Sequence, residues 1–222
     1  MMDVRVRVAA GENSAMTYRR LRALIGWIGL SLPIVLFTAG VLGRHVQQSL
    51  SGYYYTGVGP YLTGAVCVIG VFLLAYRFGD KGVENFLTTI AGLAALGVAF
   101  VHAAPPDPTP VDLRWAAVHL TCAGILFVLL GAIAVFLFPS DVPADRAWQA
   151  RLYRGLGAVI WVAIVAMVAL NALVPEFYRR THLFFWLESV CVIAFSVSFI
   201  LKGYLRCGGT APSTAGSDAG PA

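Results

Sequence analysis

The stretch LFFWLESVCVIAFSVSFIL, residues 183–201, contains nineteen residues, of which only Glu188 carries a formal charge. An α-helix crosses a bilayer core about 30 Å thick with roughly 20 apolar residues, so this stretch has the length and composition of a membrane span. It does not alternate between polar and apolar residues, which favours a helix over a strand. The stretch therefore predicts a membrane protein.

Five further apolar runs of similar length lack a formal charge, and they lie at residues 24–42, 58–76, 86–104, 115–138 and 156–174. Proline and glycine separate several of the runs, as expected at helix ends. Close helix packing is predicted at four glycines inside the runs: Gly64, Gly70, Gly92 and Gly97. The fold class predicted is all-α, a polytopic membrane bundle of about six transmembrane helices over residues 21–205.

Composition excludes several other classes of protein. Of the 222 residues, 59% are hydrophobic and 12% charged, and a soluble domain has about twice that charged fraction. The net charge of +5 comes from short basic clusters between apolar runs, not from one basic face, so no nucleic-acid partner is predicted. The four cysteines lack close paired spacing and predict neither a disulfide framework nor a metal site.

Positive charges predict the orientation, because cytoplasmic loops of membrane proteins are enriched in Lys and Arg. Four lie on one side of the six predicted helices, namely Arg44, Arg114, Arg179 and Arg180. Twelve lie on the other: Arg5, Arg7, Arg19, Arg20, Arg22, Arg77, Lys81, Arg146, Arg151, Arg154, Lys202 and Arg206. Both termini are therefore predicted to be cytoplasmic. Residues 1–20 form the N-terminal segment, and residues 206–222, rich in Gly, Ala, Ser and Pro, are predicted to form a disordered tail.

Two ionisable residues lie deeper than the others on the predicted outer side. His119 is four residues into the fourth run and Glu188 five into the sixth, which is about 6 and 8 Å at 1.5 Å per residue. A charged carboxylate is costly in lipid, so Glu188 is predicted to face the bundle interior and either to pair with His119 or to carry a proton. Such a pair is either structural, holding helices together, or part of a functional pocket in which both are catalytic candidates.

Other polar residues on the same side are candidates for binding a ligand: Ser49, Ser51, Tyr53, Tyr54, Thr56 and Asn171. The alternative for the tyrosines is an aromatic belt at the membrane surface. His45 and His182 stand beside arginines and are interpreted as solvated interfacial residues. The histidine spacing matches no zinc motif, so no metal site is predicted, and no cofactor is indicated.

The segments SLSGYYYTGVGPYLTGAVCVIGVFLLAYR, residues 49–77, and FFWLESVCVIAFSVSFILKG, residues 184–203, resemble a family of bacterial six-helix membrane proteins of unknown function. The match covers roughly residues 21–205 and is carried by Ser49, Ser51, Tyr53, Tyr54, Thr56, His119, Glu188 and Lys202. It implies the same fold and carries no activity with it. The predicted location is the plasma (inner) membrane, as a multi-pass protein. A looser similarity connects the chain to the alkaline ceramidase and progestin-receptor superfamily of zinc hydrolases, whose HxxxH pair on a late helix is missing here.

Three classes of function remain open from the sequence. The first is a membrane protein that binds a small molecule or lipid in an outward-facing polar pocket. The second is a membrane-embedded enzyme, a hydrolase or cyclase, that uses Glu188 and His119. The third is a scaffold subunit of a membrane complex. Membrane lipids are the expected partners in each case.

Overall fold

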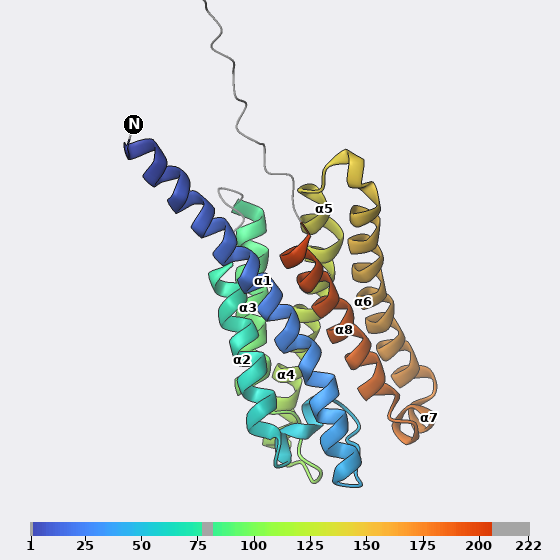
Figure 1. Cartoon of the computed structure of the whole chain (residues 1–222). Coiled ribbons are helices and arrows are strands. Elements are labelled where there is room, and N and C mark those ends of the chain that lie inside the picture. Colours follow the sequence, from blue (N-terminus) through green and yellow to red (C-terminus); the bar gives the residue numbers. More distant parts are fainter. Residues whose placement is uncertain (1, 77–81, 206–222) are drawn as a thin grey trace, which may run out of the picture.

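A computed structural model describes residues 2–76 and 82–205, in which every regular element is helical. The long helices are α1 (Met2–Leu42), α2 (Gly59–Ala75), α3 (Gly82–Phe100), α4 (Pro110–Ala132), α6 (Ala147–Leu173) and α8 (Leu183–Tyr204). The short elements are η1 (Ser51–Tyr55), η2 (Ile133–Leu137), α5 (Phe138–Ser140), η3 (Ala144–Arg146) and α7 (Pro175–Arg180). The long helices run side by side as a bundle (Figure 1).

Five segments of the described chain are long and apolar enough to cross a membrane: Arg19–Leu42, Gly82–Phe100, Pro110–Ser140, Ala144–Leu173 and Leu183–Tyr204. Helix α2 is also apolar but has only 17 residues. The protein is therefore a multi-pass helical membrane protein, as the sequence predicted. The six predicted runs overlap, in order, with α1, α2, α3, α4 to α5, α6 and α8.

Helix α1 continues without a break through the predicted boundary at residue 20, from Met2 to Leu42. Its membrane segment begins at Arg19. Figure 1 shows the start of α1 and the end of α8 at the same end of the bundle, here called the terminal end. The opposite end, the loop end, carries the connection of residues 43–58 between α1 and α2. The predicted disordered tail, residues 206–222, lies outside the described residues.

Small residues let neighbouring helices approach closely, as packing in lipid requires. A Cβ atom built on Gly92 of α3 would lie 2.8 Å from the Gly70 carbonyl oxygen of α2. A Cβ atom built on Gly97 would likewise lie 2.6 Å from the sulfur of Cys122 on α4. Packing at these three glycines is as predicted. The prediction for Gly64 was wrong, because no atom outside its immediate surroundings lies within 4 Å of a Cβ there.

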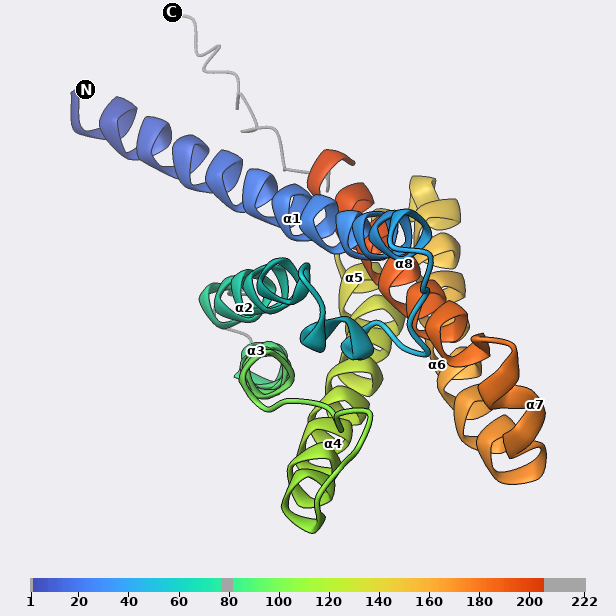
Figure 2. The ribbon, with the colours of Figure 1, turned by 90° about the horizontal axis from the view of Figure 1, so that it is seen from below.

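Among the residues whose burial the structure describes, helix α8 has more buried residues than any other helix, and it packs against both α1 and α6. Figure 2 shows α8 beside α1 and α6, with α2 and α3 further from α8, while α4 runs into α5 towards α6, against which it packs. In the same view the segment 43–58 crosses from the end of α1 over the bundle to the start of α2. This crossing segment, with η1 inside it, positions the candidate site.

Candidate functional site

Glu188 lies on α8 at the loop end and is 6% exposed. One of its carboxylate oxygens, Oε2, accepts a hydrogen bond of 2.7 Å from the backbone N–H of Leu50. Leu50 is itself buried and directly precedes η1. Burying a carboxylate is costly unless it is hydrogen-bonded, and here the donor is the backbone of the crossing segment. Glu188 therefore ties that segment to α8.

His119 on α4 ties the next residue of the same segment. Its Nδ1 lies 2.6 Å from the Val101 carbonyl oxygen. Because a carbonyl only accepts, Nδ1 carries the proton and leaves Nε2 as an acceptor. Ser51 Oγ donates to this Nε2 over 2.9 Å. The two hydrogen bonds, Leu50 to Glu188 and Ser51 to His119, form what we call the polar clamp.

The predicted direct pair of Glu188 with His119 was therefore wrong. Each residue bonds to a different residue of the crossing segment, and no hydrogen bond joins the two side chains to each other. Helices α4 and α8 touch only marginally, and Leu50 and Ser51 of the crossing segment connect them through these two hydrogen bonds. Counting residues along the two helices predicts that His119 and Glu188 lie at the same depth in the membrane. It does not predict that the backbone of another segment binds to them at that depth.

Most of the other predicted binding residues fold the crossing segment on itself. Ser49 Oγ accepts from the Gly52 N–H at 2.9 Å, and Thr56 Oγ1 donates to the Tyr53 carbonyl at 2.7 Å. The buried Tyr53 hydroxyl oxygen accepts from the Gln47 N–H at 3.4 Å. Burial raises the pKa of the Tyr53 phenol. These contacts shape the loop, whatever further role the residues have.

The remaining predicted residues lie apart from these contacts. Tyr54 lines, together with Ser51 and His119, a small cavity of about 10 Å³. That is space for about one water molecule. Asn171 has an exposed side chain near the end of α6 and lines neither the central cavity nor the cleft described below.

A central cavity of about 70 Å³ lies next to the polar clamp, inside the bundle. Its lining is apolar, from α1, α2, α3, α4 and α8, except where Ser51 and Glu188 contribute to it. The cavity has room for a few water-sized groups, which is much less than the 300 Å³ or more of a typical ligand pocket. Ser51 and His119 have the hydrogen-bonded geometry of a nucleophile and its base, and the two cavities that Ser51 lines have volumes of about 70 and 10 Å³.

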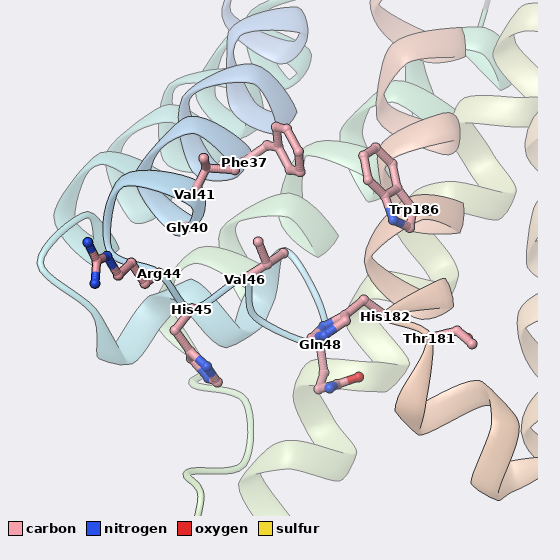
Figure 3. Close-up of a pocket in the computed structure, with 10 residues that line it drawn as sticks. All are labelled: Phe37, Gly40, Val41, Arg44, His45, Val46, Gln48, Thr181, His182 and Trp186. Carbon is pink, nitrogen blue, oxygen red and sulfur yellow. The ribbon is translucent and has the colours of Figure 1, made fainter.

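A larger cleft of about 570 Å³ opens at the loop end between α1 and α8. Figure 3 shows its lining, with Phe37 and Trp186 facing each other from the two helices. Their ring centroids are 5.2 Å apart. Towards the end of the bundle the lining is polar and includes Arg44, His45 and His182. Figure 3 shows the Arg44 side chain directed away from the two rings. Apolar rings at one level and cationic or titratable groups at the next make this loop-end cleft amphipathic.

The backbone at two residues of the loop-end cleft is unusual. Arg44 and His182 have φ angles of 57° and 52°, the left-handed region that non-glycine residues seldom adopt. His182 Nδ1 donates to the Gln47 carbonyl over 3.4 Å, so the start of α8 contacts the crossing segment. Both residues are thus held at the cleft by the chain reversals at the ends of α1 and α7.

The sequence did not single out the loop-end cleft. His45 and His182 were interpreted as solvated interfacial residues, although each follows an arginine within two positions at a helix end. That repeated arrangement was the available signal, and only the packing of α1 against α8 unites it. Among the described residues, no group of three or more His, Cys, Asp and Glu side chains is placed to hold a metal ion.

Comparison with known proteins supports a membrane protein and gives no closer assignment. The chain is 27% identical to the Na(+)/H(+) antiporter NhaA 2 of Novosphingobium aromaticivorans over 186 residues, which are 82% of this chain and 43% of that protein. The chain thus spans less than half of that relative's length. No family model and no solved structure matches. Neither family resemblance inferred from the sequence gains support at a level finer than a membrane protein.

Proposed function

We propose that this protein binds an anionic amphiphile, either a small molecule or a lipid, in the loop-end cleft. One observation carries the proposal: Arg44 lines the same open cleft of about 570 Å³ as the facing rings of Phe37 and Trp186. A guanidinium binds carboxylate or phosphate oxygens with two parallel hydrogen bonds. The two rings offer an apolar surface for the chain of the same ligand.

The polar clamp supports this function by fixing one wall of the cleft. Val46 and Gln48 line the cleft, and Leu50 and Ser51 of the same segment are held by Glu188 and His119. A preformed wall lowers the entropy lost when a ligand binds. In this proposal Glu188 and His119 are positioning residues, and neither touches the ligand.

A binding measurement with dodecanoate, a C12 carboxylate, tests the proposal on full-length protein in nanodiscs of neutral phosphatidylcholine. The variant Arg44→Asn removes the charge, and asparagine tolerates the left-handed backbone at this position. We expect dodecanoate to bind at least tenfold more weakly to Arg44→Asn. We expect less than a twofold change for Arg114→Gln, which removes an exposed arginine that does not line the cleft. Equal affinity for dodecanol, or an unchanged Kd in Arg44→Asn, contradicts the proposal.

A second candidate function is cation–proton exchange, favoured by the similarity to an antiporter and by a carboxylate on an internal cavity. In membrane proteins such a carboxylate is a common proton carrier. The test is a pH-sensitive dye inside proteoliposomes. Sodium-driven proton movement that is lost in Glu188→Gln supports exchange, and no movement with the wild-type protein excludes it.

For the topology we propose that the chain crosses a plasma (inner) membrane six times, with α2 added to the five longer spans. Both termini then lie in the cytoplasm, and the loop-end cleft lies on the outer side of the membrane. At 1.5 Å per residue α2 is about 25 Å long, close to the thickness of the bilayer core. The twelve-to-four distribution of Lys and Arg supports this orientation. Reporters in the 77–84 connection and at the C-terminus are expected to read cytoplasmic, and one at Pro106 external. An external C-terminal reporter overturns the orientation.

A further inference from the structure

A second cleft, of about 420 Å³, lies at the terminal end of the same pair of helices, α1 and α8. Its floor is formed where the two backbones meet at Gly203. A Cβ at this position would lie 2.8 Å from the backbone nitrogen of Ala23 and 2.9 Å from the Arg19 carbonyl oxygen. Only a residue without a side chain allows this approach, so the floor of the terminal-end cleft is backbone.

One wall of the terminal-end cleft carries a guanidinium that is already held in position. Arg19 Nε donates to the Gly203 carbonyl over 3.3 Å, and its Nη2 donates to the Tyr204 carbonyl over 3.5 Å. These carbonyls belong to the last turn of α8, where a cation is electrostatically favoured. Two of the five N–H donors of the guanidinium are used in this way, which leaves donors for a ligand.

The next arginine begins a stripe along α1. Arg20, Leu24 and Trp27 stand four and three residues apart, so they lie on one face of the helix and all line the cleft. Arg20 is exposed, and among the described residues neither it nor Arg19 forms an ion pair. Leu24 and Trp27 are 50% and 49% exposed within the membrane segment. The cleft is cationic at its end and apolar towards the membrane.

The aromatic side of the terminal-end cleft joins the two helices. Trp27 Nε1 donates to the Tyr204 hydroxyl over 3.4 Å, and the Tyr204 side chain is 62% exposed. Tryptophan and tyrosine with an apolar ring and a polar edge are typical of the headgroup level of a membrane. Their position places Arg19 and Arg20 where lipid phosphates lie.

We infer that the terminal-end cleft binds the phosphodiester headgroup of an anionic phospholipid. Arg20 supplies a charge-assisted pair of hydrogen bonds to the phosphate, and Arg19 supplies the remaining donors from its anchored position. The acyl chain lies along Leu24 and Trp27. A free cytosolic anion would leave this apolar surface unused, whereas a phospholipid covers the arginines and the exposed span together.

Native mass spectrometry of the full chain, released from a neutral detergent and titrated with phosphatidylglycerol, tests this inference. We expect phosphatidylglycerol to bind at least tenfold more tightly than phosphatidylcholine, and this preference to fall to less than threefold in Arg20→Gln. Arg151→Gln is the matched control, because it removes an exposed arginine of α6 that does not line the cleft. It is expected to keep the full preference.

A second variant separates the site from a general charge effect. Trp27→Leu keeps the charge and removes the hydrogen bond to Tyr204, and we expect it to weaken phosphatidylglycerol binding severalfold. An equal loss in Arg151→Gln and Arg20→Gln, or no lipid preference in the wild-type protein, overturns the inference. Competition by inorganic phosphate at the lipid concentration overturns it too, because the cleft then takes a free anion. None of these outcomes depends on dodecanoate binding at the other end.

Discussion

The two ends of α8 each bury an ionisable side chain, and they satisfy it in different ways. Lys202, 1% exposed, donates from Nζ to the Phe138 carbonyl at 2.8 Å and lies 3.5 Å from the Asp141 carboxylate. The rings of Phe138 and Tyr153 flank the same nitrogen at 5.5 and 5.7 Å. Glu188, 6% exposed, accepts from one backbone N–H and borders a cavity.

Lys202 therefore makes a fixed structural contact, whereas Glu188 lies beside a cavity that leaves its side chain room to move. Lys202 binds the segment where α4 passes through the π-helical turn η2 into α5, and it supplies a hydrogen bond to a carbonyl at the end of that helix. Its surroundings are packed. Glu188 has fewer partners and empty space beside it, and it holds a loop, so its end of the bundle is the more adaptable one.

The largest effect is expected at the packed end. Lys202→Met keeps the apolar stem but leaves the Phe138 carbonyl without its charged donor, which should lower the free energy of unfolding by about 3 kcal/mol. Asp141→Asn is the control, with an expected loss below about 1 kcal/mol, because the carbonyl contact remains and the Asp141 side chain is 34% exposed. Chemical unfolding in detergent measures both. Similar losses in the two variants would show that the ion pair, not the carbonyl, dominates.

A smaller effect is expected at the clamp. Glu188→Leu leaves the Leu50 N–H buried without an acceptor and should cost about 2 kcal/mol. Glu188→Gln keeps an oxygen for that N–H and should cost less than about 1 kcal/mol. The same unfolding measurement separates the two. A glutamine variant as unstable as the leucine variant would mean that the charge itself, and not the acceptor, holds the loop.

The smallest effect sharpens the role of the clamp as one unit. His119→Ala and Glu188→Leu release adjacent residues of the same segment. Once one substitution has loosened this segment, the other should lower the free energy of unfolding by less than it does alone. We expect the double variant to be more stable than the sum of the single effects predicts, by about 1 kcal/mol. A coupling near zero in this double-mutant cycle would show that Leu50 and Ser51 are held independently.

Much of this fold could be predicted from the sequence, because membrane spans depend on local composition. The run at residues 183–201 and the helix at Leu183–Tyr204 nearly coincide. The reason is that about twenty consecutive apolar residues match the length of a helix that crosses the hydrocarbon core of a bilayer. Burial of Glu188 also followed from the cost of a carboxylate in lipid. The partner of Glu188 did not follow, because a backbone N–H has no sequence signature. The local role of three predicted ligand residues did not follow either: Ser49, Tyr53 and Thr56 form hydrogen bonds within their own loop.

The sequence by itself determined that the chain is a helical membrane protein, where its long apolar helices lie and that Glu188 and His119 are buried. Only the tertiary structure decided that α1 lies against α8, and with this contact that a cleft opens at each end of the pair. The physical reason is the range of the interactions. Transfer of a helix into lipid depends on its own residues, whereas helix pairing in lipid depends on close packing between residues such as Gly203 and Ala23, which lie far apart in the chain.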